Sequence, residues 1–123
     1  MKYNIKMGVP EVKVYWDNVT KKYDAGLLKG DEKKNLKRLV KALVYLSNNP
    51  KHNSLSTHEI KLLSKRFGIK VWQSYLENKT PAAGRIFWVY GPGKGDITII
   101  GIEPHPEDKK RGGYEVIKLS ELP

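Results

Sequence analysis

The chain contains no cysteine among its 123 residues. This absence excludes disulfide bridges and thiolate metal ligands, and it fits a protein of the reducing cytoplasm. The chain has only three histidines, His52, His58 and His105, and their spacing does not match a structural zinc site. We therefore expect neither a metal ion nor a disulfide bridge.

Long apolar runs are also missing. No stretch approaches the ~20 apolar residues that a membrane-spanning helix needs. The opening residues, 1–6, have none of the apolar character of a signal peptide. We expect a soluble, cytoplasmic protein that has no membrane partner.

Acidic residues are scarce relative to basic ones. The chain has 23 Lys and Arg against 13 Asp and Glu, which gives a formal net charge of +10, and its isoelectric point is near 9.7. This balance is typical of proteins that meet a polyanion or an acidic protein. Lysine-rich surfaces can simply be solvated, but so large an excess on a short chain favours a nucleic-acid or acidic-protein partner.

The first half of the chain has the periodicity of two helices. Apolar residues recur every three or four positions over 12–27 and again over 36–46, and each set is expected to face a common core. The two sets are Val12, Tyr15, Trp16, Val19, Tyr23 and Leu27, and Leu36, Leu39, Val40, Leu43 and Leu46. Asp31 is a suitable N-cap for the second helix, and Asn48, Asn49 and Pro50 are expected to end it. Because the connection between the helices is short, we predict an antiparallel helical hairpin.

A third, shorter helix is predicted after the loop that follows Pro50. Ser56 and Glu59 have the spacing of a capping box, and Gly68 is expected to end the helix. This assignment places His58 in the first turn, where a histidine is ordinarily a surface residue.

The remaining segments have the composition of β-strands. Polar and apolar residues alternate over 1–7 and 69–76, and aromatic or β-branched residues dominate 85–90 and 97–102. A glycine-rich turn joins the last two strands as a hairpin, while residues 114–119 either add an edge strand or lie over the sheet. The turn lacks the Ser/Thr and the helix that would make it a phosphate-binding loop, and we expect no small-molecule cofactor. We predict a single domain, 1–123, of the α+β class, with the helical hairpin packed on a small, mainly antiparallel twisted sheet.

The two ends of the hairpin carry residues suited to phosphate chemistry. Arg85 begins its first strand, and His105 follows its second strand. Adjacent strands lie about 4.8 Å apart, so in an antiparallel pair these ends meet at one edge. A basic segment, Lys109, Lys110 and Arg111, follows closely. Together these residues would suit a phosphate-containing substrate.

Two further sets of residues admit alternative interpretations. Arg85 could instead pair with a carboxylate such as Glu103, and His105 could simply be held in a turn by its flanking prolines. Aromatic residues of the predicted strands could stack on nucleobases if they face outward, or they could belong to the core. They are Trp72, Tyr75 and Trp88.

The order of these features resembles the RelE/ParE superfamily of bacterial toxins. An N-terminal strand and a helical hairpin precede the sequence Asn-Pro-x-His-x-x-Leu-x-x-His over 49–58, an arginine-aromatic strand and a terminal histidine. The resemblance covers about 12–105. It implies the toxin of a type II toxin–antitoxin system with an acidic antitoxin protein as its partner. RelE-like members cleave mRNA, usually on the ribosome, whereas ParE-like members act on DNA gyrase and have no nuclease site.

The RelE-like branch implies a role for each candidate residue. Arg85 would hold the scissile phosphate, His105 would be the general acid and His58 the general base, with Glu77 or a lysine near Lys109 as alternatives to His58. Histidine suits proton transfer near neutral pH, and arginine offers a planar, permanently charged fork to a phosphate. The resemblance thus implies a metal-independent endoribonuclease. A ParE-like or degenerate relative that acts by protein binding, or a basic RNA-binding module, remains the alternative.

Overall fold

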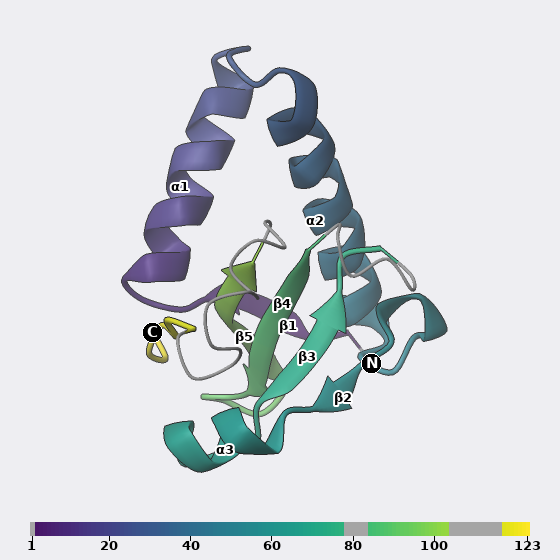
Figure 1. Ribbon diagram of the computed structural model, residues 1–123, viewed down its shortest axis with the longest axis vertical. Helices are drawn as coiled ribbons and strands as arrows, with labels where there is room; N and C mark the ends of the chain where they lie inside the picture. Colours follow the sequence, from purple (N-terminus) through teal and green to yellow (C-terminus); the bar gives the residue numbers. More distant parts are fainter. Residues whose placement is uncertain (1, 78–83, 104–116) are drawn as a thin grey trace.

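The computed structural model describes residues 2–77, 84–103 and 117–123. Within these residues five strands form one mixed sheet, and helices pack on its faces (Figure 1). The strands are β1 (Asn4–Met7), β2 (His58–Glu59), β3 (Trp72–Tyr75), β4 (Arg85–Tyr90) and β5 (Asp96–Glu103). The helices are α1 (Glu11–Asp24), α2 (Gly30–Asn48) and α3 (Lys61–Phe67), with a short 3₁₀ helix, η1 (Asn53–Leu55). The predicted α+β class, with a helical hairpin on a mainly antiparallel sheet, is confirmed.

The predicted hairpin of β4 and β5 forms the centre of the sheet, whose strand order is β1-β5-β4-β3-β2. β1 runs parallel to β5, and the other pairs are antiparallel. Arg85 lies opposite Glu103, but a bulge shifts the register between Phe87 and Trp88. Phe87 pairs with Gly101 and Trp88 with Ile99. The bulge therefore places Glu103 on the same face of the sheet as Arg85 and Phe87.

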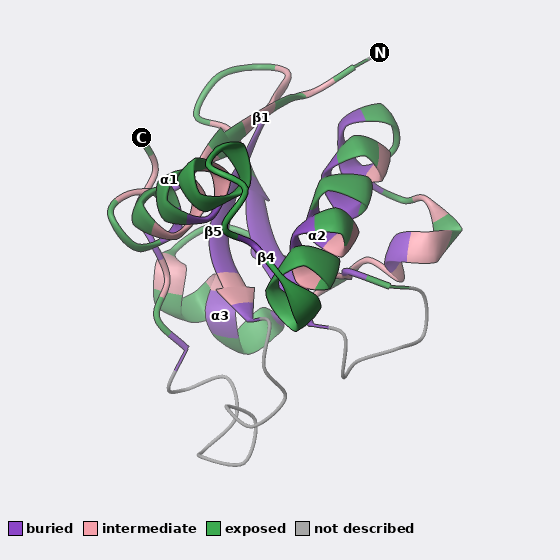
Figure 2. Ribbon diagram, turned by 90° about the horizontal axis from the view of Figure 1, so that it is seen from above, coloured by how far each residue is buried: buried purple, intermediate pink, exposed green. Residues whose placement is uncertain are grey.

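Each face of the sheet has its own apolar core. α1 and α2 diverge from a common tip toward the sheet and pack on one face, and α3 lies at the end of the sheet away from that tip (Figure 1). The view from above shows buried residues on β4, β5 and the side of α2 that faces them, whereas most of α1 is exposed (Figure 2). The core under α1 and α2 includes Val12, Leu39, Leu43, Leu46, Ile86, Trp88, Ile97 and Ile99. The core under α3 includes Leu63, Val71, Phe87, Val89, Ile100 and Ile117.

The start of α2 differs from the prediction by two residues. Lys29 is the N-cap, and α2 begins at Gly30, so Asp31 lies within the first turn. There its negative charge, with that of Glu32, is favourable beside the positive end of the helix dipole. The predicted end near Asn48 is confirmed.

The prediction that His58 lies in the first turn of a helix is wrong. Ser56 has a left-handed backbone with φ of 47°, which an N-cap residue does not adopt. His58 and Glu59 instead form β2 and pair with Gln73 and Trp72 of β3, and α3 begins only at Lys61. Pairing with the sheet therefore overrides the local capping signal. The predicted end at Gly68 is confirmed, with φ of 87°.

The C-terminal segment completes the start of α1. The N-cap residue Pro10 offers no side-chain cap. The buried hydroxyl of Ser120 accepts a hydrogen bond of 2.8 Å from the backbone N–H of Val12, and the backbone of Glu121 pairs with that of Val9. A residue 108 positions away in sequence thus supplies the capping acceptor.

Gly8 lies where this C-terminal segment crosses β5, and its replacement by alanine should destabilise the fold. A Cβ atom there would lie 2.6 Å from Ser120 Cβ and 2.8 Å from the carbonyl oxygen of Ile99. Because backbone has to move, we expect Gly8→Ala to lower the free energy of unfolding by about 1–3 kcal/mol in urea titrations. An unchanged unfolding midpoint would contradict the close approach of 117–123 to this strand.

Asp96, at the start of β5, should contribute to stability in a pH-dependent way. Desolvation raises the pKa of Asp96, but hydrogen bonds from Gly93 and Asn4 and the charge of Lys6 together lower it below the ordinary 3.8. A carboxyl group of lowered pKa stabilises the fold above its ordinary pKa, and this contribution is lost as pH falls through the folded value. In urea titrations, Asp96→Asn should therefore differ from the wild type more at about pH 7 than at about pH 3. Equal differences at both values would assign the effect to the hydrogen bonds alone.

Candidate functional site

Four polar side chains from neighbouring strands form a row on the sheet face that carries α3. They are Glu103 of β5, Arg85 of β4, Gln73 of β3 and His58 of β2, and we call them the polar row. The guanidinium of Arg85 lies over the ring of Phe87, 5.2 Å from its centroid, and Phe87 belongs to the core under α3. The register of β2 to β5 therefore brings residues from four separate segments of the chain together.

Arg85 and Glu103 form a buried ion pair at one end of the row. Nε of Arg85 donates to Oε1 of Glu103 over 2.7 Å, and Nη2 lies 2.7 Å from the same oxygen. The two side chains are only 7% and 10% exposed. Each charge therefore compensates the other where water is largely excluded. Of the two interpretations of Arg85, the ion pair with Glu103 is thus present in the structure.

Gln73 connects this ion pair to His58. Nη1 of Arg85 donates to Oε1 of Gln73 over 3.0 Å, and Nε2 of the same amide lies 3.4 Å from Nε2 of His58. Gln73 is 1% exposed, whereas His58 is exposed. Nδ1 of His58 lies 3.0 Å from the carbonyl oxygen of Ser56, and the ring meets that of Tyr75 edge-on at 6.3 Å. Two predicted catalytic residues, His58 and Arg85, therefore share one network.

The other charged candidates do not belong to the described part of this network. His105 and the basic segment Lys109, Lys110 and Arg111 lie outside the described residues. Glu77, an alternative general base, pairs with Arg38 of α2, with 2.9 Å between Oε2 and Nε. Of the candidate general bases that the structure describes, only His58 lies in the polar row.

The three candidate stacking residues differ in exposure. Trp88 is completely buried, and its Nε1 donates to Oγ of Ser74 over 2.8 Å, so Trp88 belongs to the core and cannot stack on a nucleobase. Trp72 is half-buried, stacks on Trp88, and has no hydrogen-bond partner for Nε1 within the described residues. Tyr75 is half-buried beside His58. Trp72 and Tyr75 thus retain part of their surface for a ligand.

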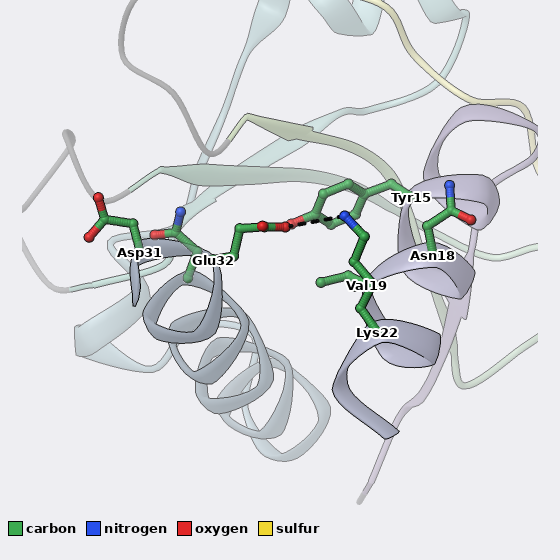
Figure 3. Close-up of a pocket in the computed structure, with 7 residues that line it drawn as sticks. Tyr15, Asn18, Val19, Lys22, Asp31 and Glu32 are labelled. Atoms are coloured by element: carbon green, nitrogen blue, oxygen red, sulfur yellow. Dashed lines mark ion pairs between the residues drawn. The ribbon is translucent and has the colours of Figure 1, made fainter. Parts of the chain in front are cut away.

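A cavity of about 240 Å³ lies between α1 and α2 (Figure 3). Nζ of Lys22 and Oε2 of Glu32 approach within 3.7 Å across it. Burial, followed by the charge of Glu32, raises the pKa of Tyr15. No group of three histidine or carboxylate side chains that could hold a metal ion occurs in 2–77, 84–103 or 117–123. The Lys22–Glu32 ion pair therefore joins the two helices across this cavity.

A second hollow between the same helices, the apolar groove, has a volume of about 480 Å³. Tyr23 and Val40, which the helical periodicity places on the inner faces, are 53% and 43% exposed here. That part of the prediction is wrong. Leu39 and Leu43 of the same helix are buried in the core under α1 and α2, so Val40 lies at the exposed edge of the buried stripe of α2. The groove is lined by Trp16, Thr20, Tyr23, Asp24, Leu36, Lys37, Val40 and Lys41.

Sequence reasoning missed Gln73 as a member of the site and treated Glu103 only as an ion-pair partner. Neither residue carries a distinctive motif. The alternation of strand 72–75 could have placed Gln73 on one face, but its neighbours follow only from the register with β2 and β4. The register of β4 and β5 similarly depends on the bulge.

No helix among the described residues is long and apolar enough to cross a membrane. Comparison of the chain with models of protein families, with curated proteins and with solved structures finds no match. The assignment of a function therefore depends on the geometry and chemistry of the polar row and of the apolar groove.

Proposed function

We propose that this protein is a metal-independent endoribonuclease, the toxin of a toxin–antitoxin pair of the RelE/ParE type. The observation that carries the proposal is the link from His58 through Gln73 to Arg85. His58, a residue type suited to proton transfer, and Arg85, a residue type suited to phosphate binding, are 27 positions apart in the sequence. Gln73 links them on one sheet face. The net charge of +10 is consistent with an RNA substrate.

RNA cleavage without a metal needs a base for the 2′-hydroxyl, a cation for the phosphate and an acid for the leaving 5′-oxygen. His58 is exposed and can meet a 2′-hydroxyl, and Arg85 supplies the cation. A phosphate oxygen that replaces the Gln73 oxygen on Nη1 would leave the ion pair with Glu103 in place. His105, two positions after Glu103 in the sequence, is our nominee for the acid.

The test is a primer-extension map of cellular transcripts after brief expression of the wild type and its variants. We expect new cleavage ends with the wild type, and a loss of about 10²- to 10⁴-fold with His58→Ala or His105→Ala. Arg85→Lys keeps the positive charge but loses the planar guanidinium with its paired donors, and should also reduce cleavage. His52→Ala and Lys94→Ala are matched controls and should cleave normally. Circular dichroism must show that each variant folds. If cellular transcripts stay intact after expression of the wild-type protein, the proposed nuclease activity is refuted.

A second candidate function, binding to a protein target, is favoured by the apolar groove. Exposed Tyr23 and Val40 offer apolar surface, and Lys37 and Lys41 flank it. This combination suits an acidic amphipathic helix of a partner protein. Growth arrest that persists in His58→Ala, leaves transcripts intact and disappears in Val40→Asp would favour this function. Val14→Asp, which alters an exposed residue of α1 outside the groove, is its control.

A further inference from the structure

The donors and acceptors of the polar row determine which way the Gln73 amide points. A guanidinium can only donate hydrogen bonds, so the atom that faces Nη1 of Arg85 must be the amide oxygen. The amide nitrogen of Gln73 consequently faces Nε2 of His58. An amide nitrogen only donates, so Nε2 of His58 must be the acceptor and carries no proton.

The other ring nitrogen of His58 completes this assignment. Nδ1 lies 3.0 Å from the carbonyl oxygen of Ser56, which can only accept, so Nδ1 carries the proton. Both contacts of His58 are satisfied only by the neutral ring with its proton on Nδ1. A proton added to Nε2 would face the N–H groups of Gln73, and the amide would have to rotate.

We propose that Gln73 is a positioning residue that couples the protonation of His58 to the hydrogen bonding of Arg85. When His58 is protonated, the amide must turn its oxygen toward Nε2, and Arg85 then loses that oxygen as an acceptor. A ligand oxygen that takes the vacated position on Arg85 favours the turned amide, which can donate to that ligand. Phosphate at Arg85 and a proton on His58 therefore strengthen each other's binding.

The groups near His58 that can carry charge lie on β2, β3, β4 and β5. Tyr75 of β3 meets the ring, and Gln73 connects it to Arg85 of β4 and, beyond that, to Glu103 of β5. Glu59 is the neighbouring titratable residue on β2 itself. The role of phosphate rests on the proposed function, whereas the tautomer of His58 and its dependence on Gln73 do not.

Nitrogen NMR of the imidazole rings in the full-length protein tests the assignment. His58 should be in the Nδ1–H tautomer above its pKa. His52 is an internal reference of the opposite kind, because its Nδ1 accepts from the backbone N–H of Ser54 over 3.1 Å, so it should be in the Nε2–H tautomer. Finding His58 in the Nε2–H tautomer would overturn the proposal.

Titrations of two Gln73 variants then test the coupling. Gln73→Glu offers a carboxylate to both neighbours and should raise the pKa of His58 by about one pH unit or more. Gln73→Leu should raise it less, because it only removes the opposing N–H. In the wild type, inorganic phosphate should increase the proton affinity of His58 about fivefold or more relative to His52, and Gln73→Leu should abolish this response.

The possible results separate this inference from the proposed function. If phosphate increases the proton affinity of His58 in the wild type but not in Gln73→Leu, the result supports the coupling even if no RNA is cleaved. If the pKa of His58 is the same in Gln73→Glu as in the wild type, and phosphate does not change it in the wild type, the coupling is overturned even if RNA is cleaved. The spectra must show that the variant is folded.

Discussion

Replacement of Glu103 by alanine is expected to lower the free energy of unfolding by about 3–5 kcal/mol. The variant would leave the guanidinium of Arg85, whose side chain is 7% exposed, without its carboxylate partner in a region from which water is largely excluded. Removal of one partner is costly because the remaining charge stays desolvated. Since a domain of this size has only about 5–15 kcal/mol of net stability, urea titration followed by circular dichroism should detect the change readily.

The double variant Arg85→Met/Glu103→Leu is the matched control for this prediction. It removes both charges and retains most of the apolar volume, so it should recover much of the stability lost in Glu103→Ala. If the double variant is as unstable as the single one, packing rather than the loss of the carboxylate explains the lower stability. The same comparison bears on any RNA-cleavage experiment, because a loss of cleavage in an Arg85 variant is informative only while the variant remains folded.

The helical hairpin and the β4–β5 hairpin could be predicted because their signals are local. Apolar residues at helical spacing, the stop at Asn49 and Pro50, and two apolar strands around a glycine-rich turn all act within one segment. The structure confirms each of these elements. Even here the periodicity misplaced Val40, because a local pattern does not fix how wide the buried face of a helix is: Leu39 and Leu43 are buried, whereas Val40 lies at the edge of that face.

The site could be predicted only in part, because its geometry depends on contacts between distant segments. Arg85 was identified from its place at a strand end, and His58 from a resemblance of order along the chain. The link between them depends on a two-residue strand, β2, whose sequence reads locally as the start of a helix. The role of Gln73 depends on its hydrogen-bond partners, His58 of β2 and Arg85 of β4, and no pattern within 72–75 indicates them.

Replacement of Trp88 by alanine is the second change with a large expected effect. Trp88 is completely buried at the centre of the sheet under α1 and α2, so its loss should lower the free energy of unfolding by about 3–5 kcal/mol. Unfolding in urea, followed by circular dichroism, measures this directly. A small effect would mean that the tryptophan is available to a ligand and does not belong to the core.

The two stacked tryptophans, Trp72 and Trp88, also offer a test of their N–H groups. Nε1 of Trp88 donates to Oγ of Ser74, whereas Nε1 of Trp72 is buried without a partner within the described residues. Phenylalanine removes the N–H from either position while it keeps an aromatic ring. Burial of an unpaired donor is unfavourable by about 1–3 kcal/mol, so Trp72→Phe recovers free energy that Trp88→Phe does not. Trp88→Phe should therefore be the less stable variant by roughly 1 kcal/mol or more. The reverse order would show that Trp72, and not Trp88, has the hydrogen bond that matters to the fold.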